Sequence, residues 1–545
     1  MKWWGWGDPA QRPRLPDHAA TFLGDHLELD GELRPPVALE DVRLAPARLP
    51  EPVRDRLCAA LGEDGLRDDR ETRVMHAAGK SYPDLLRQRA GDCEQAPDAV
   101  LMPRSREQVR AVLDACAGAG VAVVPFGGGT SVVGGVEPAR GPFDSLVSLD
   151  LGRLDRLVGV DPVSLTAVFE PGLRGPEVEA ALAPHGLTLG HFPQSFEYAS
   201  LGGFVATRSA GQASTGYGRI DELVLGVRCA TPAGDLELAP APASAAGPRL
   251  RDLVVGSEGT LGVITEAALS VRRAPEARRY EGWFFRSFEE GAQALRALEQ
   301  EHAAPDIARL SDEAETRLSI TLAGGSGLKA RVGDAYLRLR GRSGGCLAIA
   351  GWEGAREDVA RRRARSAELL RRHDGLALGR SPGAAWERSR YATPYLRDDM
   401  LERGVMVETL ETATRWSALT ELHGAVSRAL QETLEGRGTP PLVLCHVSHL
   451  YPSGASLYFT FMARQERGAE LDQWRAAKRA ASEAIVAAGA TITHHHAIGR
   501  DHAEWMPAEV GRLGVATLRA VKRELDPAGI MNPGKLLPDA APDAS

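Results

Sequence analysis

The stretch at residues 121–135, VAVVPFGGGTSVVGG, constrains the fold more than any other part of the chain. A β-branched run at residues 121–124 predicts a buried strand, and it leads into three adjacent glycines and two hydroxyl residues. Each glycine costs conformational entropy on folding and adds no side chain to a core. Such a run is typical of a backbone that turns sharply and presents N–H groups to an anion. We therefore expect a bound diphosphate, with a glycine-rich turn that holds no ligand as the alternative.

The spacing of these glycines excludes the two commonest nucleotide motifs. No lysine follows them, as a Walker A loop requires, and they do not form the G-x-G-x-x-G of a Rossmann fold. Two further glycine-rich blocks lie at residues 193–218 and 256–264. We interpret the three blocks together as the binding site of one extended dinucleotide.

Composition narrows the class of protein. A length of 545 residues predicts more than one domain, and a net charge of −8 argues against a nucleic-acid partner. The six cysteines lack C-x-x-C spacing, which favours reduced thiols in a cytoplasmic protein. No apolar run reaches the length of a membrane span, and we expect no signal peptide. The tryptophans at residues 3–6 are interpreted as a staple of the amino terminus, with a membrane-surface contact as the alternative.

The pattern along the chain predicts an α+β fold in four parts. Residues 1–92 form an N-terminal arm and helical region, and residues 93–274 a dinucleotide-binding domain. Residues 275–490 form a second domain on a largely antiparallel sheet, and residues 491–545 carry a histidine triplet, a helix and a tail. We expect strands at residues 121–124, 145–151, 166–170, 283–285, 346–352, 405–408, 442–446 and 457–462, and helices at residues 106–118, 175–185, 287–302, 355–373, 416–434 and 507–525.

The histidine triplet is the first candidate for chemistry. His494, His495 and His496 follow a short strand pattern at residues 491–493. On an extended backbone His494 and His496 share one face and His495 takes the other. A general base, an anion binder, a metal ligand and a surface polar cluster all remain open. Metal is the weakest of these, because no nearby Asp, Glu or Cys set completes a zinc shell, and we expect none.

Three further side chains are candidates. Tyr458 lies on a strand whose alternate residues are apolar, so it points into either the core or a cleft. Arg309 and Arg397 are arginines in apolar surroundings. Each is either a structural ion pair or a bidentate contact to a phosphate or carboxylate.

These segments carry a resemblance. Residues 125–131, 200–203 and 258–264 resemble the FAD-binding segments of the vanillyl-alcohol-oxidase/PCMH flavoprotein superfamily. Within it the whole chain resembles the alkyldihydroxyacetonephosphate synthase family of ether-lipid synthesis. The markers of that family lie at residues 2–7, 308–310, 395–398, 454–459 and 494–499. The resemblance implies an α+β fold with a PCMH-type FAD-binding domain and a cap for the substrate, built on an antiparallel sheet flanked by helices.

The resemblance also separates two enzyme classes. Superfamily members that oxidise 2-hydroxy acids carry Gly-Glu-His-Gly where this chain has residues 494–497, and an Asp-Gly-Asn that residues 449–458 lack. The Asn-Pro-Gly-Lys at residues 532–535 is common in those oxidases and points the other way. The alternative function is therefore an FAD-dependent dehydrogenase or oxidase for a D-lactate- or glycolate-type acid. A flavin-binding protein without catalysis is the third hypothesis.

The family reaction exchanges the acyl group of acyl-dihydroxyacetone phosphate for a fatty alcohol. The resemblance implies that Tyr458 assists proton transfer and that His495 and His496, beside His494, serve as base and phosphate contacts. It implies that Arg397 positions Tyr458 or the phosphate, and that Arg309 orders the site from behind. The partners are then lipid substrates, with possible peripheral membrane contact, and we expect a homodimer.

The implied cofactor is FAD, bound without a covalent link because Phe126 occupies the position that often attaches it. The residues expected to bind FAD are Pro125, Phe126, Gly127, Gly128, Gly129, Thr130, Ser131, Pro193, Gln194, Ser195, Ser200, Leu201, Gly202, Gly203, Thr207, Arg208, Ser209, Ala210, Glu258, Gly259, Thr260, Leu261, Gly262, Val263 and Ile264.

Overall fold

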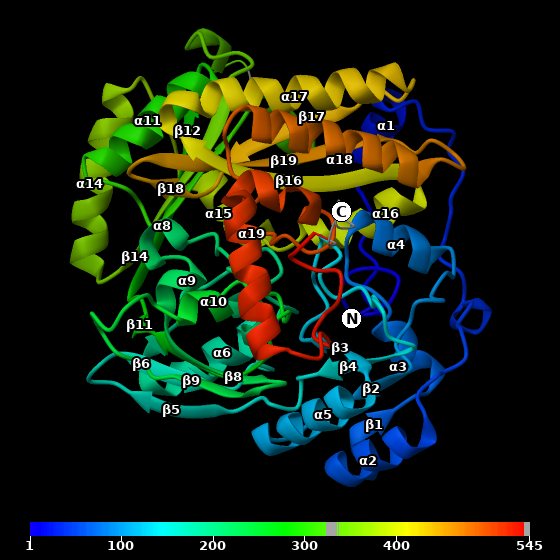
Figure 1. The fold of residues 1–545 in the computed structure, drawn as a ribbon. Coiled ribbons are helices and arrows are strands. Elements are labelled where there is room, and N and C mark those ends of the chain that lie inside the picture. Colours follow the sequence, from blue (N-terminus) through cyan, green and yellow to red (C-terminus); the bar gives the residue numbers. More distant parts are fainter. Residues whose placement is uncertain (323–334, 336, 539–545) are drawn as a thin grey trace.

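The computed structural model describes residues 1–322, 335 and 337–538, and it has two halves, one above the other (Figure 1). The lower half contains two larger sheets and the two-stranded pairing of β7 (Leu187–Thr188) with β11 (Arg272–Arg273). The first has the order β1-β2-β4-β3 and comprises β1 (Leu66–Arg67), β2 (Ala99–Leu101), β3 (Val121–Phe126) and β4 (Ser145–Asp150). The second has the order β5-β6-β10-β8-β9 and comprises β5 (Leu157–Asp161), β6 (Thr166–Phe169), β8 (Val224–Thr231), β9 (Gly234–Leu238) and β10 (Val263–Ser270).

The parallel pairing of β3 with β4 brings the glycine run to one end of the first sheet. Helix α5 (Arg106–Ala119) begins where the Ser105 side chain accepts a hydrogen bond from the Gln108 backbone. It ends at Gly120, whose left-handed conformation turns the chain directly into β3. The Gln108 side chain accepts from the Arg104 backbone N–H instead of that of Ser105, so only half of a capping box forms.

The upper half is one long antiparallel sheet. Its order is β15-β12-β14-β13-β17-β19-β16, with β18 (Leu450–Tyr451) paired beside β19. The strands are β12 (Ala277–Phe285), β13 (Ile307–Ser311), β14 (Cys346–Gly354), β15 (Leu376–Gly379), β16 (Val405–Arg415), β17 (Leu442–Val447) and β19 (Gly454–Arg464). The helices of this half are α11 (Phe288–Gln300), α12 (Glu313–Leu322), α14 (Arg356–Arg372), α15 (Arg380–Ser389), α16 (Thr393–Glu402), α17 (Leu419–Gly436) and α18 (Glu470–Ala487).

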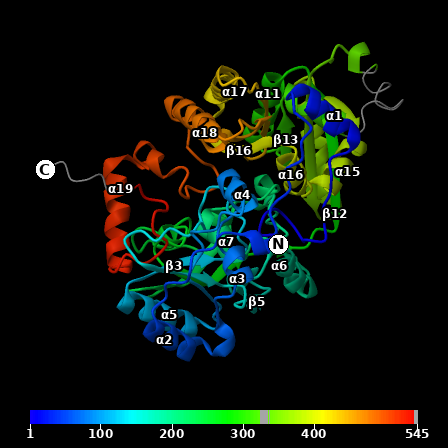
Figure 2. The ribbon, with the colours of Figure 1, turned by 90° about the vertical axis from the view of Figure 1, so that its right-hand side faces the viewer.

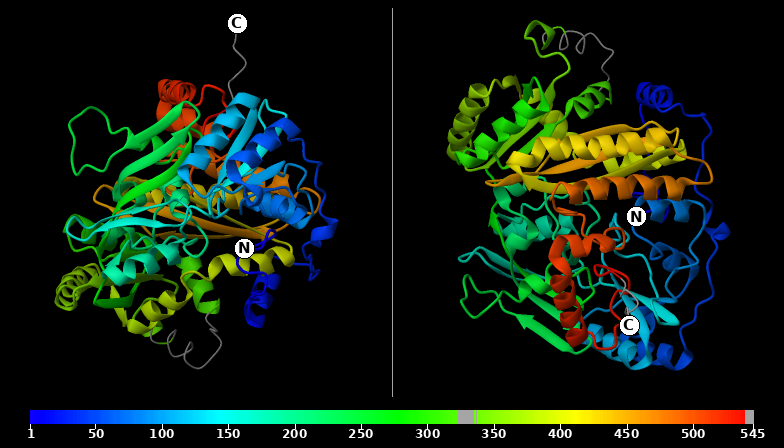
Figure 3. Two further views of the ribbon diagram at one scale, coloured as in Figure 1. Left: turned by 90° about the horizontal axis from the view of Figure 1, so that it is seen from below. Right: turned by 45° about the horizontal axis from the view of Figure 1, so that its top comes forward.

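The two faces of this sheet have different neighbours. Helices α17 and α18 lie on the face turned away from the lower half, as Figures 1 and 3 show, and pack with Phe459 and Phe461 in one core. Side chains alternate along a strand, so Tyr458 on β19 points the other way, toward the lower half.

Two segments tie the halves together. Helix α19 (Met506–Leu525) runs down the front of the molecule, and near its lower end Lys522 Nζ donates to the Thr260 carbonyl at 2.8 Å (Figure 1). The chain start lies between the halves, beside α16 and α4 (Tyr82–Arg89) (Figure 2). The other helices of four residues or more that lie wholly within the described residues are α1 (Asp17–His26), α2 (Glu51–Leu61), α3 (Arg70–Met75), α6 (Gly175–Leu182), α7 (Leu201–Thr207), α8 (Ser214–Tyr217), α9 (Ile220–Leu223) and α10 (Arg251–Val254).

The α+β class and the predicted strands and helices are confirmed, with ends shifted by a few residues and β12, β16 and β19 longer than expected. The strand expected at residues 491–493 is wrong. Only an isolated bridge joins Thr491 to Ala413, and the chain then bends. Among the described helices, none is long and apolar enough to span a membrane.

Candidate active site

The glycine run is held tightly against the second glycine-rich block. A Cβ on Gly127 would lie 2.1 Å from Ser200 Oγ, and one on Gly128 would lie 2.0 Å from the Tyr198 carbonyl oxygen. Two of the three glycines are therefore also required for close packing of one loop on another. That corrects the expectation that packing plays no part in this run. The left-handed Gly129 (φ +66°) then turns the chain over the Phe126 ring.

Residues of all three glycine-rich blocks line one cavity. Twelve of the expected FAD residues line it: Pro125, Phe126, Gly127, Ser131, Ser200, Gly202, Gly203, Thr207, Glu258, Gly259, Gly262 and Ile264. Five lining residues were not expected: Gly135, Val136, Leu151, Ala206 and Ala497. Eight of the seventeen lining residues are glycine or alanine, so a bound dinucleotide can approach the backbone closely at those positions.

The other expected cofactor residues lie outside this cavity wall. They are Gly128, Gly129, Thr130, Pro193, Gln194, Ser195, Leu201, Arg208, Ser209, Ala210, Thr260, Leu261 and Val263. Some have structural partners: Gln194 Nε2 donates to the Arg390 carbonyl, and Arg208 pairs with Asp221. Their contact with FAD stays a prediction.

A buried carboxylate organises the histidine triplet. Glu411 on β16 accepts hydrogen bonds from the backbone N–H groups of His494, His495 and His496 at 2.6–2.9 Å, and from the Thr493 hydroxyl. The bent backbone turns all three N–H groups to one anion, so the histidines do not alternate between two faces as an extended strand would place them. Their rings touch, with centroids 5.2 Å apart for the first pair and 4.8 Å for the second.

Burial sets the charge of this cluster. It lowers the pKa of all three imidazoles, that of His496 to about 3, so they are neutral bases near pH 7. Burial alone would raise the pKa of Glu411, but the surrounding imidazoles and the Thr493 hydroxyl hold it well below its usual value. The site is therefore an ionised, fixed carboxylate surrounded by uncharged imidazoles.

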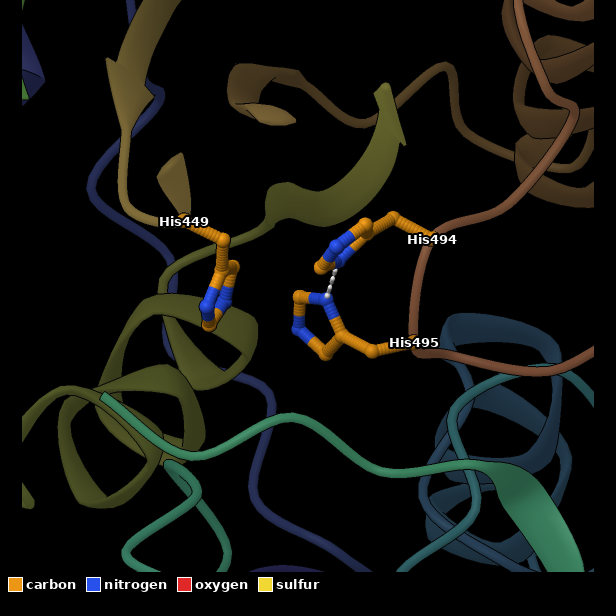
Figure 4. Close-up of side chains that lie close together, drawn as sticks. All are labelled: His449, His494 and His495. Atoms are coloured by element: carbon orange, nitrogen blue, oxygen red, sulfur yellow. Dashed lines mark hydrogen bonds between the residues drawn. The ribbon is translucent and has the colours of Figure 1, made fainter. Parts of the chain in front are cut away.

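His449 is a member of this cluster that the sequence analysis did not select. It follows β17, and its Nδ1 lies 2.5 Å from Ser214 Oγ. Figure 4 shows it opposite His494 and His495, whose Nδ1 atoms are 2.9 Å apart. One ligand nitrogen from each of the three lies within 4.8 Å of the others, which brings three potential metal ligands together. A structural zinc takes four ligands, one more than these three histidines supply. The Glu411 carboxylate is not free to be the fourth, because four donors already engage it. The absence of a resident metal stays a prediction.

Tyr458 faces the cluster rather than the apolar core. Its ring stacks on His446 at 4.9 Å and meets His496 edge-on at 5.3 Å. Burial raises the pKa of Tyr458 to about 12, although Thr409 and Arg397 act in the opposite direction. The phenol is therefore a proton donor at neutral pH. Arg397 is the cationic neighbour that lowers the pKa of Tyr458, while the buried histidines are neutral.

The two arginines behave differently. Arg309 Nη2 pairs with Glu315 Oε1 at 2.8 Å and lies 3.1 Å from His446 Nδ1, so it contacts Tyr458 only through the His446 ring. Arg397 on α16 donates one hydrogen bond, from Nη1 to the Lys80 carbonyl. Its Nε and Nη2 are buried and find no partner among the described residues. A buried guanidinium with two free donors is suited to a phosphate or carboxylate.

These features define the class of protein. Residues 97–238 match the family model described as FAD binding domain, and residues 274–536 match FAD linked oxidases, C-terminal domain. A FAD-dependent enzyme of two domains is thereby shown, and binding of the cofactor in this cavity stays a prediction.

The particular family follows from full-length relatives. An alkyldihydroxyacetonephosphate synthase of Dictyostelium discoideum is 33% identical over 99% of this chain and 93% of its own. The synthase of Trypanosoma brucei brucei is 34% identical over 99% and 92%. A solved alkyldihydroxyacetonephosphate synthase structure is 30% identical, covers 99% of both chains and has a TM-score of 0.85. The chain belongs to the alkyldihydroxyacetonephosphate synthase family, which confirms the resemblance and the PCMH-type fold.

Proposed function

We propose that this enzyme exchanges the acyl group of acyl-dihydroxyacetone phosphate for a fatty alcohol. The observation that carries the proposal is the position of the histidine triplet. Residues 494–496 run directly into Ala497, which lines the FAD cavity, while the Tyr458 ring packs on His496. Proton-transfer groups are thus adjacent to the flavin site. The intact Tyr458, Arg397 and histidines weigh against a flavin-binding protein without catalysis.

The residues divide the work by charge. Because the imidazoles of His495 and His496 are neutral, either can take the proton from the carbon beside the substrate ketone. Tyr458 keeps its proton at neutral pH and can donate a hydrogen bond to an oxygen that gains negative charge. His446, held by Glu315 and Arg309, fixes the plane of the Tyr458 ring. Arg309 is therefore a positioning residue.

Arg397 is the group proposed to hold the substrate phosphate. Its guanidinium offers two buried donors that meet no other described residue, and its third is fixed by the Lys80 carbonyl. A dianionic phosphate supplies the missing acceptors and offsets the buried charge. FAD, when bound, supplies an electron-accepting ring that allows the bond to the acyl oxygen to break without net redox change.

One anaerobic experiment separates this function from its rival. The FAD-loaded protein is mixed with acyl-dihydroxyacetone phosphate and hexadecanol, and separately with D-lactate or glycolate. We expect ether product and free fatty acid without an electron acceptor, and an unchanged yellow colour with the hydroxy acids. Bleaching by a hydroxy acid, with no ether formed, would establish the dehydrogenase instead. The Asn-Pro-Gly-Lys at residues 532–535 keeps that rival worth testing.

Three finer features belong to the same proposal. We propose that FAD is held without a covalent bond. Phe126 occupies the usual attachment position, and both ring nitrogens of the neighbouring His76 are engaged, by Thr72 and Asp150. Denaturation should release all the flavin into the soluble fraction.

We also propose a homodimer that works in the cytoplasm, at the surface of the membrane that supplies its lipids. The six free cysteines support a reducing compartment, and light scattering and vesicle co-sedimentation test the other two points.

A further inference from the structure

Three buried polar atoms behind His496 have no hydrogen-bond partner within the described part of the chain. They are Nζ of Lys478 on α18, Oδ2 of Asp501 and Nδ1 of His496 itself. Lys478 is only 5% exposed. The Lys478 ammonium and the Asp501 carboxylate oxygen are costly to bury without partners, and bound water can supply the hydrogen bonds that they lack.

The electrostatics show that these groups share one environment. Burial raises the pKa of Asp501 to about 7, and the Lys478 ammonium acts against that rise. Glu408 on β16, Asp84 on α4 and Glu137 after the glycine run raise it further. These are the charged groups that face Asp501 from the packed elements.

The same ammonium reaches the neighbouring histidines. Burial lowers the pKa of both His496 and His502 to about 3, and Lys478 contributes to both shifts. Lys478 therefore acts electrostatically on the triplet from behind. It does so from a helix that contributes nothing to the cavity wall.

A second phosphate site is the other possibility for a buried lysine, and the chemistry disfavours it. An anion at Lys478 would also meet the Asp501 carboxylate and the negative charges of Glu408, Asp84 and Glu137. The Asp501 residue is half-buried, whereas its Oδ2 atom is out of contact with solvent. Its side chain therefore lies at the boundary between the interior and the surface.

We propose that Lys478 and Asp501, bridged by water to His496, form the route by which protons pass between the active site and solvent. This inference rests on the proposed function. The exchange converts an ester and an alcohol into an ether and a carboxylic acid. The proton taken from the substrate carbon passes to an imidazole, then through water to the Asp501 carboxylate, and returns along the same path when the ether is complete. The fatty acid leaves as a carboxylate, and the hydroxyl proton that the alcohol loses as the ether bond forms leaves along this route to solvent.

The test compares Asp501→Asn and Lys478→Met with a matched control, Glu504→Gln. Glu504 is an exposed carboxylate of the next turn, paired with Arg479. The exchange rate is measured from pH 5.5 to 9 on FAD-loaded enzyme, and the protonated carboxyl band is followed by infrared spectroscopy. In the natural protein we expect the protonated carboxyl band to disappear as pH rises through about 7. The exchange rate should rise over the same pH range, because the Asp501 carboxylate is the proton acceptor.

Asp501→Asn should abolish that band and slow the exchange about tenfold or more, which is the lower end of general acid–base effects. Lys478→Met should move both the band and the rate profile to higher pH by roughly one unit, because the ammonium that favours the carboxylate is gone. Lys478→Arg should restore both, and Glu504→Gln should change neither.

The outcomes separate the two proposals. If the natural protein forms no ether at any pH, the proposed function is wrong, and the infrared band alone then decides whether Asp501 and Lys478 are coupled. If the natural protein is active and Asp501→Asn keeps its rate and pH profile, the proton route is wrong. A band that stays in place in Lys478→Met overturns the coupling even if Asp501→Asn fails to fold.

Discussion

Tyr458 lies between an imidazole that fixes its plane and the histidine triplet, and its phenol keeps its proton at neutral pH. We expect Tyr458→Phe to bind FAD with unchanged affinity and to lose about 10²- to 10⁴-fold in exchange rate, the usual contribution of a positioned proton donor. Tyr280→Phe is the matched control, because its hydroxyl is also buried and bonded to a carboxylate, Glu353, far from the triplet. The control should lose about 1 kcal/mol of stability and no activity. Equal rates in the two variants would remove Tyr458 from the chemistry.

Gly128 tests how closely the glycine run packs on the second glycine-rich block, at the scale of one methyl group. A Cβ there would lie 2.0 Å from the Tyr198 carbonyl oxygen and 2.8 Å from Ala199 Cα, both backbone atoms that cannot swing aside. Overpacking of this kind costs about 1–3 kcal/mol, so Gly128→Ala should weaken FAD binding roughly ten- to hundredfold in a fluorescence titration. Gly118→Ala in α5 has open space around it and should bind FAD normally while gaining up to about 1 kcal/mol of stability. Equal affinities in both variants would contradict the tight packing of the two loops.

At this scale the sequence predicts residues whose type is unusual for its surroundings. The glycine run, the histidine triplet and a tyrosine on an apolar strand stand out in that way. Glu411 and His449 do not, because each is a single polar residue whose importance depends on a distant segment. Glu411 is one of two carboxylates in β16 and acquires its role only when the 494–496 backbone folds over it.

At the scale of an element, the first eight residues form a strap beside Arg397, the arginine proposed to bind the substrate phosphate. Lys2 Nζ pairs with Asp398 at 3.0 Å, and their side chains are 1% and 10% exposed. Lys80 Nζ donates to the Lys2 and Trp3 carbonyls, and the Lys80 carbonyl in turn accepts from Arg397. The strap therefore fixes Lys80, whose carbonyl accepts from Arg397, and Asp398, the residue that follows Arg397 in the chain. Trp3 and Trp6 are buried, and they attach the amino terminus to the rest of the molecule as the sequence predicts.

Removing one charge from this strap should be costly. Lys2→Met leaves Asp398 buried with an unpaired charge, which typically costs about 3–5 kcal/mol. We expect a lower unfolding midpoint in urea and a KM for the acyl substrate raised several-fold, with a smaller change in kcat. The double variant Lys2→Met/Asp398→Asn should recover part of the stability, because the neutral amide can still accept from the Trp6 N–H. A double variant as unstable as the single one would show that the pair itself is unimportant.

Elements that the sequence missed share a physical cause. Helix α18 buries alanines and a lysine along its inner face, so its apolar periodicity is weak and the sequence analysis predicts no helix there. The strand pattern at residues 491–493 is overridden because Glu411 offers a better partner for the following N–H groups than a neighbouring strand does. Both outcomes depend on tertiary contacts that a local pattern does not contain.

At the scale of the molecule, the active site exists only where the two halves close on each other. The glycine cradle belongs to the lower half, while Tyr458, His446 and Arg397 belong to the sheet and helices of the upper half (Figure 1). The 494–499 loop lies between them. On its upper side, the backbone N–H groups of residues 494–496 donate to Glu411. On its lower side, the Glu258 carboxylate accepts from the backbone N–H groups of Ile498 and Gly499 at 2.9 and 2.7 Å.

Glu258 makes this closure dependent on pH. Burial raises its pKa to about 7, while the hydrogen bonds from Ile498 and Gly499 act in the opposite direction. A carboxyl whose pKa is higher in the folded protein than in the unfolded chain stabilises the fold at low pH, and this contribution is lost as pH rises through the folded value.

We therefore expect the natural protein to lose about 2–3 kcal/mol relative to Glu258→Gln between pH 5 and pH 8, from the span between about 4.3 and 7. Urea unfolding of both proteins at the two pH values, followed by tryptophan and flavin fluorescence, measures the difference. Glu237→Gln, an exposed carboxylate paired with Arg106, should track the natural protein at both pH values. A constant gap between the natural protein and Glu258→Gln would mean that Glu258 stays ionised throughout, and that the two halves are joined by a fixed charge rather than by a titrating one.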